Sequence, residues 1–200
     1  MKKRIAVLVS GGGTNLQALL DAEAAGKIPH GEIALVISNN PNAYALERAR
    51  CAGVTGVVIT KKACGSQQAF EAQIQTALED NNIDLIILAG FMCILSEHFT
   101  SRWPRKILNV HPSLIPSFCG EGFYGLRVHQ AALDYGVKVT GATVHFVNEI
   151  PDGGEIILQK AVDILPGDTP EILQRRVMEQ AEWILLPQAA QIVCANLGGN

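Results

Sequence analysis

Five short apolar runs shape the first half of the chain. Each run is continuous rather than alternating, which is typical of strands in a parallel sheet whose two faces are both covered by helices. We predict strands over Ile5–Val9, Ile33–Ser38, Gly56–Ile59, Leu85–Leu88 and Ile107–Val110. Segments with helical spacing separate them, and we predict helices over Asn15–Ala25, Ala43–Ala52 and Gln67–Asn81. This alternation predicts an α/β fold, doubly wound, with a mostly parallel sheet and helices on both faces.

The pattern changes after His111. Residues 112–122 contain two prolines and two glycines, which predict an ordered loop. Beyond this loop we predict a helix over Leu126–Tyr135, two strands over residues 139–147 and 155–165, and a long helix over Thr169–Ala195. Thr169 suits the N-cap of that last helix, and Pro170 suits its first position. We find no internal repeat or linker, and we expect a single domain over residues 1–200.

A glycine cluster, Gly11-Gly12-Gly13, joins the first strand to the first helix. Backbone N–H groups at such a turn, together with the helix dipole, bind phosphate. The segment has no lysine, so it is not a Walker A loop. It also lacks the dinucleotide fingerprint, because Leu16 stands where the third glycine belongs and the second strand ends without a carboxylate. We expect a single phosphate bound by Gly13, Thr14 and Asn15 through main-chain N–H groups and short polar side chains, and the alternative is a tight turn that binds nothing.

Two polar side chains end the fifth predicted strand. Asn109 and His111 are two positions apart, so they share one face of the strand, and Pro112 stops it. The carboxyl ends of parallel strands meet at one edge, so this pair lies on the same edge as the glycine cluster. A carboxamide and an imidazolium are both donors, and together they can stabilise an oxyanion. We expect a carboxylate to raise the pKa of His111, and Asp152 in the turn "PDGG" is the candidate.

The other histidines carry less information. We expect His30, His98 and His129 on the surface or in loops, and we interpret His145, within "TVHFV", as a core histidine whose hydrogen bonds are satisfied.

Composition and charge narrow the class of protein. Hydrophobic residues make up 48% and charged residues 18%, which is typical of a globular protein. The formal net charge of −3 gives no general attraction for nucleic acid or anionic membranes. The five cysteines form no CxxC pair, so we expect neither a disulfide framework nor a metal site. No apolar run is long enough for a signal peptide or membrane span, and we expect a cytoplasmic protein, monomeric or homodimeric.

From Ile5 to its last helix the chain resembles the glycinamide ribonucleotide transformylase family, also called phosphoribosylglycinamide formyltransferases. The resemblance is carried by "SGGGTNLQAL", "SNNPNAYALERA", "LAGFMCIL", "NVHPSLIPSFCG", "GATVHFVNEIPDGGEIILQ" and "EWILLP". It implies direct transfer of the formyl group of 10-formyltetrahydrofolate, a co-substrate, to the amine of glycinamide ribonucleotide in de novo purine biosynthesis. The reaction passes through a tetrahedral intermediate and needs no metal.

The resemblance also implies roles for individual residues. Asn109 and protonated His111 would stabilise the oxyanion, and Asp152 would raise the pKa of His111 and help relay a proton. The nucleotide would lie against the N-terminal half, with Gly12, Gly13, Thr14 and Asn15 around its phosphate, and Glu182 would contact its sugar. Folate would lie against Gln67, Met92, Cys93, Ile94, Leu95, Asn109, Asn148, Glu149, Ile150, Pro151 and Asp152.

This sequence departs from the family at two folate-side positions. Gln67 and Cys93 stand where some members have arginines, so the resemblance does not carry over a cationic contact for the glutamate tail of folate. The segment "CGEGFYG" (119–125) is longer and richer in glycine than in some relatives, and we expect it to act as a mobile lid.

Two alternatives remain open. One is another formyl-folate enzyme, either formyltetrahydrofolate deformylase or methionyl-tRNA formyltransferase. Both usually carry a further domain for which we see no room, and the net charge does not suit tRNA. The other is a non-catalytic nucleotide-binding domain, which would have no reason to combine Asn109, His111 and Asp152.

Overall fold

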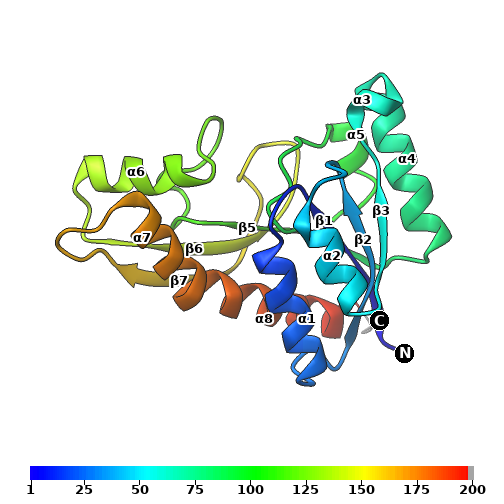
Figure 1. The fold of residues 1–200 in the computed structure, drawn as a ribbon, viewed down its shortest axis with the longest axis horizontal. Coiled ribbons are helices and arrows are strands. Elements are labelled where there is room, and N and C mark those ends of the chain that lie inside the picture. The colour runs from blue at the N-terminus through cyan, green and yellow to red at the C-terminus, as the bar shows by residue number, and fades with distance from the viewer. Residues whose placement is uncertain (198–200) are drawn as a thin grey trace.

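A computed structural model describes residues 1–197 and contains a seven-stranded sheet with helices on both faces (Figure 1). The sheet order is β3-β2-β1-β4-β5-β6-β7. The first five strands are parallel, and the last two are antiparallel to their neighbours. The strands are β1 (Lys3–Val9), β2 (Gly31–Ser38), β3 (Thr55–Val58), β4 (Leu85–Leu88), β5 (Ile107–His111), β6 (Val139–Phe146) and β7 (Ile156–Asp163). The predicted fold class is confirmed, and every predicted strand ends within two residues of its observed bounds.

The helices alternate with the strands in the first half of the chain and close it at the end. They are α1 (Thr14–Ala24), α2 (Tyr44–Cys51), α3 (Lys61–Cys64), α4 (Gln67–Asp80), α5 (Glu97–Thr100), α6 (Leu126–Tyr135), α7 (Pro170–Val177) and α8 (Trp183–Asn196). We did not predict α3 and α5, because four residues are too few to show a helical period. Thr169 caps α7 as predicted, since its side chain accepts a hydrogen bond from the N–H of Ile172.

Residues of each central strand alternate between two apolar cores. In β1, Val7 faces the core shared with α1, α2 and α8, whereas Leu8 faces the core shared with α4 and α5. Figure 1 shows α1 and α8 on one side of the sheet and α4 on the other, with β6, β7, α6 and α7 extending away from β3. Burial on both faces explains why the parallel strands are continuous apolar runs.

The final helix differs from the prediction. Instead of one regular helix, a π-helical turn, η1 (Met178–Glu182), separates α7 from α8. Such turns are short and often lie at functional sites, and their single extra residue leaves no mark on an apolar pattern. Here the turn ends at Glu182, whose side chain is buried against α1.

Candidate active site

Asp152 lies at the centre of a polar cluster built from β5, β6 and the loop that joins β6 to β7. One carboxylate oxygen, Oδ2, lies 3.4 Å from Nδ1 of His111 and accepts a 2.9 Å hydrogen bond from the N–H of Gly120. The other, Oδ1, lies 3.5 Å from both Nδ2 of Asn109 and Nε2 of His145. The structure therefore brings together the three residues that we predicted to act in catalysis, and it adds His145 and the Gly120 N–H.

The strand register explains how the cluster forms. Asn109 and His111 share a face of β5, and β6 pairs with it so that His145 lies opposite Asn109. A sharp turn after β6 returns the chain to this face, with Asp152 in the left-handed conformation at φ 56°. Gly154 must lack a side chain, because a Cβ there would overlap the carbonyl of Phe146.

Acceptor atoms face both nitrogens of the His111 ring. Nε2 donates a 2.9 Å hydrogen bond to the carbonyl of Phe118, and Nδ1 faces the Asp152 carboxylate. Nevertheless, burial lowers the pKa of His111 below its ordinary value, and it outweighs the upward effects of Asp152 and the Phe118 carbonyl. Asp152 acts on His111 in the predicted direction, but our expectation of a raised pKa is wrong, because desolvation of the ring exceeds the attraction of the carboxylate.

The Asn109 amide also contacts other side chains of the protein. His145 donates from Nδ1 to the carbonyl of Phe146 at 2.8 Å, so its Nε2 can accept from Nδ2 of Asn109 at 3.3 Å. The second amide hydrogen faces Asp152, at the long distance of 3.5 Å. Asn109 and His111 thus converge on Asp152, and a substrate oxygen must take over contacts that the protein makes here.

Asp152 remains an anion despite its partial burial. Burial raises the pKa of its carboxyl, but the side chain of His145, the charge of His111 and the Gly120 N–H together lower it below its usual value. The cluster therefore holds a carboxylate within reach of two imidazoles, an arrangement suited to moving a proton.

The glycine cluster forms the N-terminus of α1. Gly13 adopts a left-handed conformation at φ 72°, and a Cβ there would lie 2.6 Å from the Cβ of Ala45 in α2. The first intrahelical hydrogen bond runs from the N–H of Gln17 to the carbonyl of Gly13. The N–H groups of Thr14 and Asn15 precede that bond, so they have no partner within the helix and suit an anion.

Asn15 and Glu182 form a buried pair beside this turn. Nδ2 of Asn15 donates a 2.8 Å hydrogen bond to Glu182, and burial raises the pKa of Glu182 to about 7. We expected the Asn15 side chain to help hold the phosphate, but it lies against Glu182, and only its main-chain N–H belongs to the turn. The two residues predicted on the nucleotide side are therefore in direct contact.

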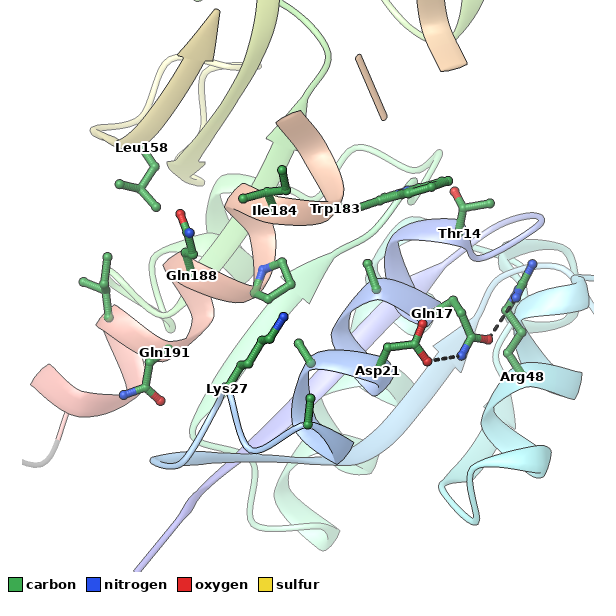
Figure 2. A pocket seen from close by; sticks show the side chains of 15 residues that line it. Thr14, Gln17, Asp21, Lys27, Arg48, Leu158, Trp183, Ile184, Gln188 and Gln191 are labelled. Atoms are coloured by element: carbon green, nitrogen blue, oxygen red, sulfur yellow. Dashed lines mark hydrogen bonds between the residues drawn. The ribbon is translucent and has the colours of Figure 1, made fainter. Parts of the chain in front are cut away.

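A cavity of about 840 Å³ lies between α1 and α8 (Figure 2). Its lining includes Thr14, Arg48 and Trp183 at the glycine-cluster end and Lys27 and Gln191 farther along. The Asp152 cluster does not line it. The cavity therefore lies on the side of the glycine cluster, and the Asp152 cluster lies outside it.

The residues predicted for folate fall on two loops beside the Asp152 cluster. Leu88 pairs with Asn109 in the sheet, so the loop after β4 starts next to the cluster, and the loop after β6 carries Asp152 itself. Gln67 reaches the first loop, where its amide donates to the carbonyl of Ile94 at 3.1 Å. Among the residues predicted for folate on these loops, Met92, Ile94, Glu149, Ile150 and Pro151 have exposed side chains.

The side chains of three other predicted folate residues make contacts within the protein. The Leu95 side chain lies in the core beneath α4, which leaves only its main chain for a ligand. The sulfur of Cys93 accepts a hydrogen bond from Nδ2 of Asn39. Oδ1 of Asn148 accepts from the N–H of Ile150 and holds the turn of the second loop.

The remaining histidines are only partly as expected. His30 and His98 are exposed, but His129 is fully buried in α6. Neither ring nitrogen of His129 has a hydrogen-bond partner within residues 1–197, and burial lowers its pKa to about 4. The prediction for His129 is therefore wrong: the helix turns this residue inward beside Val128, an orientation that its polar type did not indicate.

Two general expectations concern metals and membranes. Among the described residues, no group of three or more His, Cys, Asp and Glu side chains is arranged as a metal site, and all five cysteines are free. Within the same 197 residues, no helix combines the length and the apolar character needed to cross a bilayer.

Comparisons with known proteins show the family to which the chain belongs. Residues 3–189 match the family model described as formyl transferase. The phosphoribosylglycinamide formyltransferase of Haemophilus influenzae is 46% identical over 185 residues, which cover 92% of this chain and 84% of that protein. The human trifunctional purine biosynthetic protein adenosine-3 is 45% identical, but this chain spans only 19% of its length. Several other relatives that match are trifunctional proteins of which this chain likewise spans a fifth or less.

Solved structures give the same result. The crystal structure of glycinamide ribonucleotide transformylase 1 from Symbiobacterium toebii superposes with a TM-score of 0.91 and 44% identity, covering 98% of this chain and 89% of that one. The phosphoribosylglycinamide formyltransferase of Brucella melitensis superposes with a TM-score of 0.89 and 41% identity, covering 98% of this chain and 97% of that one. The resemblance stated from the sequence motifs is confirmed, and the chain belongs to the formyl transferase family.

Proposed function

We propose that this protein is a phosphoribosylglycinamide formyltransferase, which transfers the formyl group of 10-formyltetrahydrofolate to the amine of glycinamide ribonucleotide in purine biosynthesis. The observation that carries the proposal is the Asp152 cluster, in which a carboxylate lies 3.4 Å from His111 and 3.5 Å from Asn109. It occurs in a chain that matches relatives named for this activity over almost its whole length.

The reaction needs an oxyanion site and a route for one proton. The substrate amine attacks the formyl carbon, a C–N bond forms, and the carbonyl oxygen becomes an oxyanion. The amide of Asn109 and the ring of His111 donate to this oxygen once the formyl group displaces their present partners. Preorganised donors of this kind stabilise a tetrahedral intermediate strongly, each being worth on the order of 10²–10³ in rate.

Asp152 transfers the proton between the two nitrogens. The attacking nitrogen loses a proton as the intermediate forms, and the folate nitrogen must gain one as its bond to carbon breaks. A carboxylate held as an anion next to two imidazoles can accept the first proton and supply the second, directly or through water. The atoms balance without an outside acid, oxidant or metal.

The loop that contains Phe118 must move before the formyl group can reach His111. Nε2 of His111 donates to the Phe118 carbonyl, and the N–H of Gly120 donates to Asp152, so this loop occupies donors and acceptors that the substrates need. We propose that residues 119–125 act as the predicted lid and rearrange when both substrates bind.

The nucleotide and the folate approach from different sides of Asp152. The N–H groups of the glycine turn take the phosphate, and Glu182, beside Asn15, takes the sugar hydroxyls. On the other side, Met92, Ile94 and Ile150 are each more than half exposed and offer apolar contacts to a flat heterocycle. Both substrates are small molecules, and we place the reaction in the cytoplasm.

A direct assay tests the proposal against other formyl-folate reactions. The purified protein is mixed with 10-formyltetrahydrofolate and either glycinamide ribonucleotide, initiator methionyl-tRNA or buffer alone. We expect tetrahydrofolate to form only with the ribonucleotide. Equal release in buffer alone would indicate a deformylase, and transfer only to the tRNA would indicate the corresponding transferase.

A further inference from the structure

Arg48, in α2, is attached to the glycine turn. Its Nε donates a 2.8 Å hydrogen bond to the carbonyl of Gly12, and its Nη1 donates to Oε1 of Gln17 at 2.9 Å. Its guanidinium carbon lies 5.0 Å from the centre of the Tyr44 ring, which it covers. A carbonyl, an amide and an aromatic face therefore hold one cation beside the first turn of α1.

This cation has no carboxylate partner. Most arginines of the chain, such as Arg4 and Arg50, pair with a carboxylate, whereas no Asp or Glu within residues 1–197 lies within 4.0 Å of the Arg48 guanidinium. The connection to an acid is indirect, since the amide of Gln17 donates to Asp21 at 2.8 Å, as the dashed lines of Figure 2 show. The charge of Arg48 is therefore available to a bound anion, because a neutral carbonyl and a neutral amide orient it without cancelling it.

The contacts of α2 also fix the direction of the turn. The N–H of Ala45 donates to the carbonyl of Gly11 at 3.1 Å, next to the bond from Arg48 to Gly12. Two successive carbonyls of the turn thus face α2, and no Cβ fits between Gly13 and Ala45. A peptide carbonyl and the N–H of the same unit point in opposite directions, so the following N–H groups face away from α2.

Arg48 and Thr14 line the same cavity between α1 and α8, so the cation is on the side from which a ligand enters (Figure 2). The Nη2 atom of Arg48 has no hydrogen-bond partner within the part of the chain that the structure describes. A doubly charged phosphate at the turn would meet the main-chain N–H groups directly, and it would be attracted across the turn by a guanidinium that has no carboxylate partner within residues 1–197.

We propose that Arg48 is a positioning residue of the phosphate subsite, where it sets the direction of the Gly12 peptide and makes binding selective for the phosphorylated form of the nucleotide. The inference rests on the proposed function for the identity of the nucleotide, but not for the presence of a phosphate. It assigns α2, which contributes no residue to the Asp152 cluster, a part in recognising the substrate.

The test compares phosphorylated and phosphate-free substrates in matched variants. Arg48→Met keeps an unbranched side chain over Tyr44 and removes the charge and donors, Arg48→Lys keeps the charge, and Arg50→Met removes an exposed arginine two residues away. We expect Arg48→Met to raise KM for glycinamide ribonucleotide by about 10- to 100-fold, as for loss of a charged hydrogen-bond donor. The kcat value and KM for formyl-folate should change by less than about twofold, Arg48→Lys should be intermediate, and Arg50→Met should match wild type.

The phosphate-free glycinamide riboside separates recognition from a structural role. Its kcat/KM should be the same in wild type and Arg48→Met. If Arg48→Met weakens both substrates equally, or weakens neither, the proposed selectivity is wrong. Thermal unfolding of each variant identifies a general loss of structure, and in that case Arg48→Lys decides the question with the same two substrates.

Binding of ribose 5-phosphate by calorimetry keeps this inference separate from the proposed function. If the wild-type protein does not formylate glycinamide ribonucleotide, the proposed function fails. Arg48 is still supported if ribose 5-phosphate binds to wild type about 10-fold or more tightly than to Arg48→Met, and is overturned if the two bind alike.

Discussion

Nδ1 of His111 lies 3.4 Å from the Asp152 carboxylate, although one residue ends a parallel strand and the other lies in the turn between two antiparallel strands. This contact joins the two topological halves of the sheet at the point where the polar side chains gather. It also opposes the desolvation of the imidazole, which otherwise favours the neutral ring.

Asp152→Asn tests that contact. Without the carboxylate, the pKa of His111 should fall further below its ordinary value, because the effect of burial is then less opposed. Turnover should fall on the order of 10²–10⁴-fold, since the proton acceptor that we propose is gone. NMR titration of the His111 ring and steady-state kinetics measure the two effects. An unchanged histidine pKa would contradict the charge-pairing role, and unchanged nucleotide binding is the control for folding.

His145→Gln tests a residue that we took for part of the core. Gln still offers an acceptor to Asn109, but its amide cannot be protonated, so the variant loses the ring that lowers the pKa of Asp152. We expect kcat to fall roughly 10-fold, the effect of about one net hydrogen bond. His98→Gln, which changes an exposed histidine, should leave kcat unchanged. Equal kcat values in the two variants would return His145 to a purely structural role.

Glu182 should make the protein less stable as pH rises. Burial raises its pKa from 4.5 to about 7, so between these values the folded state binds a proton that the unfolded state has lost. Its contribution to the free energy of unfolding is complete below pH 4.5 and is lost as pH rises through 7, with a total on the order of 3 kcal/mol. Urea denaturation at pH 5 and pH 8 measures it.

Glu182→Gln should lose this dependence, while Glu121→Gln, which alters an exposed carboxyl, should behave as wild type does. Identical differences between the two pH values in Glu182→Gln and wild type would show that the carboxyl is not neutral when buried.

His129 should have the opposite effect and make the protein less stable as pH falls. Burial lowers its pKa from 6.5 to about 4, so the unfolded state binds a proton in this range that the folded state does not. The stability from the neutral ring is complete above pH 6.5 and is lost as pH falls through 4. His129→Leu should flatten that part of the pH profile in urea denaturation and raise stability at neutral pH, because two unpartnered ring nitrogens leave the core. A profile as steep as that of wild type would contradict this account.

Gly13→Ala should destabilise the turn in two ways, through a left-handed φ of 72° and through contact with Ala45. Left-handed strain alone costs roughly 1–2 kcal/mol, and the overlap adds about 1–3 kcal/mol. Gly26→Ala is the matched control, because Gly26 has φ 69° but open space where its Cβ would lie. The difference between their free energies of unfolding isolates the clash, and only Gly13→Ala should raise KM for the nucleotide.

The sequence predicts the parallel half of the fold well, because buried strands and their helices impose clear periods. Ile5–Val9 and Leu85–Leu88 are apolar at every position, which is typical of central strands in such a sheet. The motifs also predict Asn109, His111 and Asp152 as a group, but not the sign of the shift in the pKa of His111. That sign depends on how deeply the loop around Phe118 buries the ring, a tertiary property that no spacing encodes.

Two other features could not be predicted from the sequence, for different reasons. His145 alternates with Val144 and Phe146 as a core residue would, and only the register with β5 places it opposite Asn109. Arg48 lies in an ordinary helical pattern, and its contact with Gly12 depends on how α2 packs against the glycine turn.

The π-helical turn after α7 helps a long row of apolar side chains to stay on the side of the helix that faces the sheet. Buried residues recur at every fourth position through the last helical stretch, namely Leu173, Val177, Ala181, Leu185, Ala189 and Val193. In a regular α-helix a step of four residues overshoots a full rotation by about 40°, so such a row would wind away from the sheet. The wider turn absorbs part of that drift. One extra residue thereby lets a single stripe of small and branched side chains follow the sheet from β6 to β2, and it brings the only buried carboxylate of residues 170–196 against Asn15, beside the glycine turn.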